Sequence, residues 1–217
     1  DVLTEDIIDA FNAGAGAVFY AGHADEQRWF TSAFGTDYVK ELNNAGMLPL
    51  VFSVACHAGN FVDTDCFAEK LLTGNNYDEN VGAAGAFMST GSISWVAPMH
   101  AQDAMADIIA SGAESMSFGA IAAGGCMAMN EIYFWAGDKV TDTWVLFGDP
   151  SLEFRSTYPA ALEVEHPDQI ASLAQYVPVK AIADYALATL SDKGKLIASV
   201  ELNGEQGFIP VNGTLEK

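Results

Sequence analysis

The sequence predicts an α/β domain built on a parallel β-sheet, followed by a smaller all-β domain. Short continuous apolar runs alternate with segments of helical periodicity over residues 1–157, which is typical of parallel strands joined by helices. From about residue 158, short apolar runs separated by Pro, Gly, Asn and Asp replace the helical pattern. We therefore expect two domains, at 1–157 and 158–217.

The N-terminal part of the chain predicts helix, strand and helix in that order. A helix is expected to begin at Thr4, whose side chain can cap it, and the Gly-rich residues 12–16 end it. The apolar run at 17–21 predicts a strand buried on both faces. A second helix is expected over residues 36–44.

The same alternation continues to the end of the first domain. Residues 48–55 and 81–88 predict two further buried strands, with a helix over 65–72 between them. Two longer helical stretches follow, and then a segment with a strand, a Gly-Asp-Pro turn and an extended piece. These last ranges are 99–110, 116–135 and 141–154.

The second domain is expected to be a small β-sandwich. Its apolar runs lie at 161–166, 176–183, 195–202 and 207–211. About 60 residues are few for a sandwich of this kind, which is consistent with one that is cut before its last strand.

The charge balance excludes two classes of partner. The 217 residues include 9 Lys and Arg against 29 Asp and Glu, a formal net charge of -20. The resulting field repels phosphate backbones and anionic lipid, so we expect neither nucleic acid nor membrane surfaces as partners. Solubility and attraction of cationic ligands remain as interpretations of the acidic surface.

No targeting or membrane segment is expected in this sequence. No stretch reaches the roughly 18 uninterrupted apolar residues of a transmembrane helix, so we expect no membrane insertion. The sequence starts at Asp1 without a basic leader, and we interpret it as a processed or excised segment.

An imidazole and a thiol follow two successive predicted strands. His23 comes after the strand at 17–21, and Cys56 comes directly after the strand at 48–55. Parallel strands end at one edge of a sheet, where a thiol beside an imidazole can act as a nucleophile with its base. Gly59 would let the chain turn sharply and expose the sulfur. An inert buried thiol and a structural histidine remain the alternatives from the residues alone.

Other active-site chemistries find less support in the sequence. The run "GAGAVF" lacks the third glycine of a dinucleotide fingerprint and precedes its strand, and no GxSxG motif follows a strand. His57 lies beside Cys56, but no second Cys or His group has the spacing of a metal site, so we expect no metal and no cofactor here. Cys66 and Cys126 lie on helical stretches and are expected to be buried.

Five segments, in order along residues 1–157, resemble the gingipain-like cysteine peptidases, which share the caspase-like fold. "YAGHADEQRW" resembles the strand, histidine and tryptophan of that family, "VACHAGNF" its nucleophile segment and "DCFAEKL" the helix that follows. "SISWVAPMHAQDAM" and "DTWVLFGDPSLEFR" resemble later segments of its catalytic domain. The β-rich tail falls where the family carries an immunoglobulin-like domain. The resemblance implies the second half of a catalytic domain with a caspase-like parallel sheet flanked by helices.

The resemblance also assigns roles to individual residues. Cys56 would be the nucleophile and His23 the general acid and base, with a thioester acyl-enzyme that water hydrolyses. The backbone N–H groups of Ala24 and Cys56 would form the oxyanion hole, with Ala24 where the family usually has glycine. Trp95 matches the tryptophan that flanks the substrate side chain at P1, and Glu26 matches a carboxylate beside the same pocket.

Each of these pocket residues has an alternative interpretation. Asp25 and Glu26 would suit a cationic P1 residue, or they form a solvated acidic loop. Trp95 either contacts substrate or packs at the root of a loop. Trp29 is expected to pack in the interior, and His57 is expected to be a solvated bystander.

The function implied by the resemblance is that of a secreted or cell-surface cysteine endopeptidase that acts on protein or peptide substrates. A sortase-like transpeptidase of a bacterial secretion system and a non-catalytic peptide-binding relative are the alternatives. In the family, an earlier half supplies the carboxylate that orients the histidine, the main acid of the P1 pocket and most calcium sites. We expect those groups upstream of Asp1, so this segment alone is expected to lack them.

Overall fold

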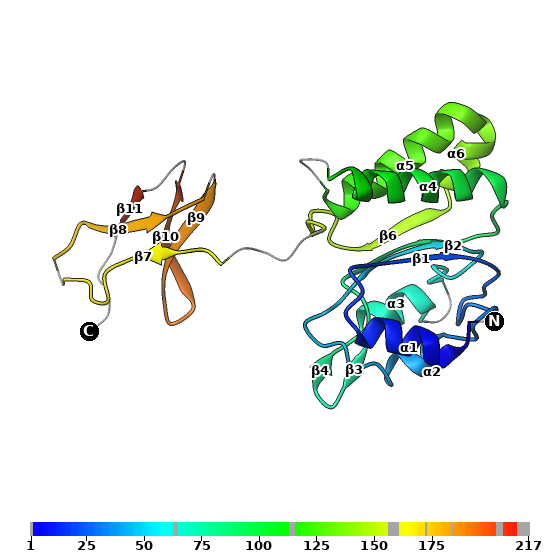
Figure 1. Cartoon of the computed structure of the whole chain (residues 1–217), viewed down its shortest axis with the longest axis horizontal. Coiled ribbons are helices and arrows are strands. Elements are labelled where there is room, and N and C mark those ends of the chain that lie inside the picture. Colours follow the sequence, from blue (N-terminus) through cyan, green and yellow to red (C-terminus); the bar gives the residue numbers. More distant parts are fainter. Residues whose placement is uncertain are drawn as a thin grey trace. The chain divides into compact units, whose positions relative to one another are not determined.

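The computed structural model describes residues 2–62, 65–112, 116–155, 161–171, 173–183, 185–202 and 206–211. The chain divides into two compact units, Asp1–Thr157 and Tyr158–Lys217, and the boundary itself lies outside the described residues. The first unit has helices on both faces of one β-sheet, and the second is built from small antiparallel sheets (Figure 1).

The first unit alternates helices and strands as its sequence predicts. Its elements are α1 (Thr4–Asn12), β1 (Ala17–Ala21), α2 (Thr36–Val39), β2 (Leu50–Val54), α3 (Phe67–Leu72), β3 (Asn75–Asn76), β4 (Glu79–Asn80), β5 (Gly85–Ser89), α4 (Val96–Ser111), α5 (Phe118–Tyr133), α6 (Trp135–Thr141) and β6 (Trp144–Gly148). The short hairpin of β3 and β4 was not predicted, because each strand has only two residues.

The main sheet is mixed, so the expectation of a wholly parallel sheet is wrong for its last strand. The strand order is β1-β2-β5-β6, in which β1, β2 and β5 are parallel and β6 is antiparallel to β5. Three helices, α4, α5 and α6, lie between β5 and β6, and they return the chain to the edge at which β5 ends. The Thr90 N–H accordingly donates to the Thr143 carbonyl at 2.8 Å, where β5 ends and β6 begins.

The position of each strand in the sheet decides its burial. All five residues of the inner strand β2 are buried. β1 was expected to be buried on both faces, but it forms the edge of the sheet and its Phe19 side chain is 37% exposed. An apolar run alone does not distinguish an edge strand from an inner one.

Two hydrophobic cores lie on opposite faces of this sheet. The helices α1, α2 and α3 cover one face of the sheet, and α4 and α5 cover the other (Figure 1). Side chains of β2 alternate between the two cores, with Val51 in the first and Phe52 in the second. The first core includes the fully buried Trp29, Phe34 and Phe67. Because both faces are covered, functional groups of this sheet are confined to its edges and loops.

The helix ends differ from the predictions in several places, including the start of α4 at Val96 instead of residue 99. α1 begins with Thr4 itself, whose hydroxyl donates to the Ser32 carbonyl at 2.6 Å and so does not cap the helix. α2 ends at Val39 and is shorter than expected. The helical stretch expected over 116–135 is interrupted at Phe134, where a φ of 45° separates α5 from α6.

The second unit is all-β, as predicted. Its strands are β7 (Val164–Glu165), β8 (Tyr176–Ala181), β9 (Ala186–Asp192), β10 (Lys195–Leu202) and β11 (Gln206–Pro210). They form two antiparallel sheets, β11-β8-β7 and β10-β9, whose side chains share one small core. The immunoglobulin-like assignment stays a prediction. In the part of the chain that the structure describes, no helix has the length and apolar character that a membrane crossing requires.

The stacked rings of Phe52 and Phe19, whose centroids are 5.0 Å apart, provide a test of the sheet order. Phe52→Ala is expected to lower the free energy of unfolding of the first unit by about 3 to 5 kcal/mol, because Phe52 is only 1% exposed. Phe19→Ala should cost clearly less, since its ring is partly solvated. Tryptophan fluorescence during urea unfolding reports on this unit alone, because all four tryptophans lie in residues 1–157. Equal losses for the two variants would contradict the edge position of β1.

Candidate active site

The parallel pairing of β1 and β2 brings the histidine and the first cysteine to the same edge of the sheet. Ala21 pairs with Val54 at the end of both strands, and the Gly22 N–H donates to the Val54 carbonyl at 3.1 Å. Each functional residue follows two positions later. His23 and Cys56 line one cavity of about 80 Å³, together with Gly22, Val54, Ala55, Ile93, Ser94 and Trp95.

The loop after β5 holds the cysteine in place. Cys56 is half-buried, and its Sγ accepts a hydrogen bond from the Ile93 N–H at 3.4 Å and lies 3.7 Å from the Ile93 carbonyl, to which it can donate. The next residues are fastened to the same loop, because the His57 N–H donates to the Gly91 carbonyl at 3.1 Å and the Gly59 N–H to the Ser89 carbonyl at 2.9 Å. The sulfur is therefore fixed by residues more than thirty positions away.

The sharp turn after the cysteine occurs at His57, not at Gly59 as expected. His57 has a φ of 59°, in the left-handed region that disfavours side chains with a Cβ. Gly59 is needed for a different reason. A Cβ there would lie 3.0 Å from the Phe147 ring and 3.1 Å from the Met88 carbonyl oxygen, so the turn could not pack this closely against β5.

The backbone of His23 is held while its ring lies at the cavity. The His23 carbonyl accepts hydrogen bonds from the Phe30 N–H and from the Tyr20 hydroxyl, both at 2.8 Å. A side chain at Gly22 would overlap the Tyr20 hydroxyl, which explains the glycine before the histidine. The exposed imidazole meets the Trp95 ring edge-on, with ring centroids 5.0 Å apart and an interplanar angle of 82°.

Of the two residues whose backbone N–H groups were predicted to form an oxyanion hole, Cys56 lines the cavity and Ala24 does not, so the oxyanion hole stays a prediction. Ala24 pairs with Trp29 in an antiparallel bridge. The two hydrogen bonds of this bridge run from the Phe30 N–H to the His23 carbonyl and from the Asp25 N–H to the Arg28 carbonyl. The Ala24 N–H takes no part in them and points away from the bridge. Neither the Ala24 nor the Cys56 N–H has an acceptor among the described residues. Ala24 is also not among the described residues with a positive φ, so alanine adopts this backbone without strain.

Trp29 and the two other cysteines occupy the interior, as predicted. Trp29 is fully buried and its Nε1–H donates to Ser53 Oγ at 3.0 Å. Cys66 is fully buried and Cys126 is 8% exposed, and all three cysteines are free thiols. Burial raises the pKa of the Cys66 thiol to about 11 and also raises the pKa of the Cys126 thiol.

The acidic residues after His23 lie beside the cavity lining and not on it. The Asp25 carboxylate accepts hydrogen bonds from the Gln27 and Arg28 N–H groups, both at 2.9 Å, and lines a separate polar pocket of about 390 Å³. Glu26 Oε1 accepts a hydrogen bond from Asn60 Nδ2 at 3.2 Å. The substrate-binding roles of Asp25, Glu26 and Trp95 stay predictions, and Trp95 is the one of the three that lines the cavity.

Sequence reasoning did not single out Ile93 and Ser94, and it did not predict the contacts of His57. Ile93 and Ser94 line the cavity, and the only signal for them is their place just before Trp95 in the segment "SISW". His57 was expected to be solvated, and its side chain is 37% exposed, but its Nδ1 is buried and its Nε2 lies 3.0 Å from Ser92 Oγ. Nothing in the local sequence indicates these contacts.

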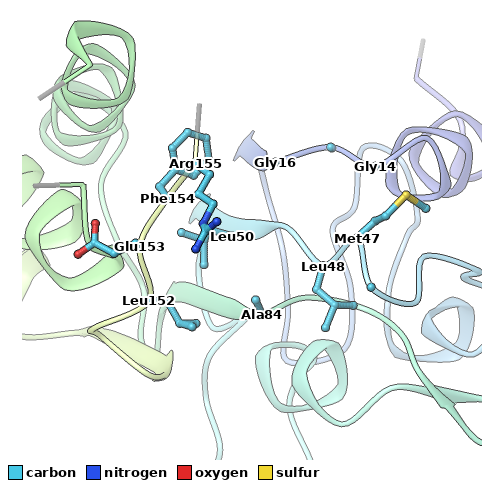
Figure 2. Close-up of a pocket in the computed structure, with 12 residues that line it drawn as sticks. Gly14, Gly16, Met47, Leu48, Leu50, Ala84, Leu152, Glu153, Phe154 and Arg155 are labelled. Atoms are coloured by element: carbon cyan, nitrogen blue, oxygen red, sulfur yellow. The ribbon is translucent and has the colours of Figure 1, made fainter. Parts of the chain in front are cut away.

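A larger pocket of about 370 Å³ lies at the opposite edge of the sheet (Figure 2). Gly14 and Gly16 line it where the chain enters β1, together with Met47, Leu48 and Phe154. None of the predicted site residues lines this pocket. In an open α/β sheet ligands bind at the carboxyl ends of the strands, which favours the smaller cavity as the reactive site.

The described residues contain no group of three or more His, Cys, Asp or Glu side chains that could hold a metal ion. The cavity is lined by one thiol, of Cys56, and one imidazole, of His23, together with the hydroxyl-bearing Ser94. A cysteine and a histidine that line one cavity at the carboxyl edge of an α/β sheet are the arrangement that cysteine peptidases use.

The family model for peptidase family C25 matches residues 1–155. Gingipain R2 of Porphyromonas gingivalis is 38% identical over 218 residues, which cover 99% of this chain and 30% of that protein. Gingipain R1 of the same species is 39% identical over 217 residues, which cover 98% of this chain and 22% of that protein. The chain belongs to peptidase family C25, and it spans less than a third of the length of these curated relatives.

Solved structures agree with this assignment. The crystal structure of the Arg specific cysteine proteinase gingipain R superimposes with a TM-score of 0.83 at 37% identity, covering 98% of this chain and 50% of that one. The complex of the pro- and mature domains of Porphyromonas gingivalis RgpB gives a TM-score of 0.82 at 37% identity, covering 98% of this chain and 51% of that one. A third structure, described as a protease, has a TM-score of 0.71 at 16% identity and shows the fold alone.

Burial predicts a clear order of thiol reactivity. Iodoacetamide at pH 8 is expected to modify Cys56 in the native protein and to leave Cys66 and Cys126 unmodified, because their buried thiols stay protonated and inaccessible. All three cysteines should react once the protein is unfolded in guanidinium chloride. Peptide mapping by mass spectrometry measures this order. Modification of Cys66 as fast as Cys56 in the native state would contradict the burial described above.

Proposed function

We propose that this chain carries the nucleophile-bearing half of the catalytic domain of a cysteine endopeptidase, which hydrolyses peptide bonds in proteins or peptides. The observation that carries the proposal is that Cys56 and His23 line the same cavity at the carboxyl edge of the sheet. Membership of peptidase family C25 supports it. By the same likeness we propose that the protein acts outside the cell or at the cell surface.

In the first step, Cys56 Sγ would attack the carbonyl carbon of the substrate peptide bond while His23 takes the thiol proton. The hydrogen bond from the Ile93 N–H supports this role, because it holds the sulfur at the wall of the cavity. His23 is suited to deliver protons since its ring is exposed at the cavity and its backbone is held by two hydrogen bonds. The step needs no metal or cofactor, because the thiol and the imidazole supply the nucleophile and the base.

The tetrahedral intermediate would place its negative oxygen between the N–H groups of Ala24 and Cys56. Both donors lack acceptors among the described residues, so no existing hydrogen bond has to break when the oxyanion forms. Loss of one such donor typically lowers kcat by about 100-fold to 1000-fold. We propose that the hairpin at residues 24–29 maintains this geometry through the burial of Trp29.

Collapse of the intermediate would release the amine product with the proton from His23 and leave a thioester on Cys56. A water molecule, deprotonated by His23, would then attack the thioester and regenerate the thiol. We propose that Trp95 flanks the P1 side chain, since it lines the cavity and its ring contacts His23. The relative described as Arg specific makes arginine the first P1 residue to test, with Glu26 and Asp25 as the nearest acids after His23.

Substitution of the nucleophile tests the proposal in the full-length protein. Cys56→Ala is expected to abolish cleavage of a fluorogenic peptide library, because no other described thiol reaches the cavity. Cys126→Ala is the matched control. The Cys126 thiol is buried in the core beneath α4 and α5, so this variant should retain most of the wild-type kcat/KM. Cleavage that survives in Cys56→Ala would refute the proposed nucleophile.

The fate of the thioester distinguishes hydrolysis from transpeptidation. With an excess of an amine such as glycine amide, a peptidase is expected to yield mostly products with free carboxyl ends, because water reaches the exposed imidazole. Mass spectrometry of the cleaved N-terminal fragments measures the ratio of free acid to amide-linked product. If the products are joined mainly to the added amine, the proposed activity is transpeptidation and not hydrolysis.

A further inference from the structure

Three loops around the predicted nucleophile meet at the imidazole of His57. Its Nε2 lies 3.0 Å from Ser92 Oγ, in the loop after β5. Its Nδ1 lies 3.8 Å from Glu26 Oε1, in the loop after β1. His57 itself directly follows Cys56, so one side chain joins the segments that carry His23, Cys56 and Trp95.

The local backbone alone does not favour a histidine at this position. The φ of 59° would suit glycine or asparagine better, and the buried Nδ1 has no hydrogen-bond partner among the described residues. Buried ring nitrogens in proteins are normally hydrogen-bonded. Both unfavourable features arise at a residue next to the nucleophile, where strain is characteristic of function.

The carboxylate that faces His57 is itself held in place. Glu26 Oε1 accepts a hydrogen bond from Asn60 Nδ2 at 3.2 Å, and the Glu26 carbonyl accepts one from the Phe67 N–H at 2.7 Å. Glu26 is the one carboxylate within 4.0 Å of the His57 ring nitrogens in the described part of the chain. The other titratable groups beside this network are the Cys56 thiol and, across the cavity, the His23 imidazole.

We propose that His57 is a positioning residue that links Glu26 to Ser92 and thereby holds the loop that bonds Cys56 Sγ. The proposal rests on the proposed function of Cys56. A protonated imidazole donates from both nitrogens, to Ser92 Oγ and toward the Glu26 carboxylate, whereas a neutral one donates from a single nitrogen. Ser92 precedes Ile93, whose N–H donates to the sulfur, so the link acts on the nucleophile through one peptide unit.

Labelling of Cys56 by iodoacetamide tests the effect on the nucleophile in the full-length protein without using the substrate pocket. At pH 6, His57→Asn and Glu26→Gln are each expected to slow labelling about twofold to fivefold, the range of a partly exposed ion pair. Asparagine tolerates the left-handed backbone, and glutamine still accepts from Asn60. The double variant should be no slower than His57→Asn, because both changes remove the same link. Ser92→Ala, on the other side of the ring, should slow labelling by a similar factor.

Unchanged or faster labelling in His57→Asn and Ser92→Ala would overturn the proposal. A double variant of Glu26→Gln and His57→Asn that slows labelling by the product of the two single effects would also overturn it. His57→Gly separates the backbone from the side chain, since glycine relieves the strain at φ 59°. If this variant labels Cys56 at the wild-type rate, the imidazole has no positioning role.

Thermal unfolding tests the link independently of any reactivity. Glu26→Gln is expected to lower the Tm by about 1 to 3 °C in the wild-type background and by less in His57→Asn. Asp65→Asn is the matched control, because Asp65 pairs with Lys70 at 2.7 Å outside this network and its effect should be the same in both backgrounds. Equal responses of the two backgrounds to Glu26→Gln would refute the link.

The two proposals fail in different ways. Wild-type Cys56 that labels no faster than an ordinary thiol would refute the proposed peptidase function, and the Tm comparison would still decide whether Glu26 and His57 are coupled. If Cys56 labels rapidly and selectively but the Tm comparison shows no coupling between Glu26 and His57, the role of His57 is refuted and the proposed function stays intact.

Discussion

The site depends on the register of the two parallel strands β1 and β2. Ala21 pairs with Val54, and both strands end at this pair, so the residues that follow leave the sheet side by side at its carboxyl edge. A shift of one residue in either strand would turn every side chain of that strand to the other face. The alternation of Val51 and Phe52 between two filled cores prevents such a shift. The packing on both faces thus places His23 and Cys56 at the same edge of the sheet.

The loops at this edge are joined to one another and to the sheet by hydrogen bonds. The hairpin after β1 is anchored by the buried Trp29 and its hydrogen bond to Ser53 of β2. The turn after β2 is bonded through the N–H groups of His57 and Gly59 to the loop after β5. A peptidase site benefits from such rigidity, because the nucleophile and the oxyanion donors must be in place before the transition state forms.

Much of this arrangement could be predicted from local patterns, and the misses have physical causes. The run "AVFYA" and the run ending at Cys56 predicted strands with functional residues at their carboxyl ends, and both strands are present. The exposure of Phe19 and the direction of β6 were missed, because neighbouring strands and the number of intervening helices decide them. The contacts of Glu26 were also missed, since its partners Asn60 and His57 lie more than thirty residues further along the chain.

The sequence by itself determined which segments become helices and strands, which residues stand at the strand ends, and the family to which the chain belongs. These features follow from hydrophobic periodicity and from short motifs, which act over a few neighbouring residues. Only the tertiary structure decided that Cys56, His23 and Trp95 share one cavity, that Asp25 lines another, and that His57 lies half-buried between Glu26 and Ser92. Each of these outcomes needs contacts between segments that are distant in the chain, and those contacts exist only once both faces of the sheet are packed.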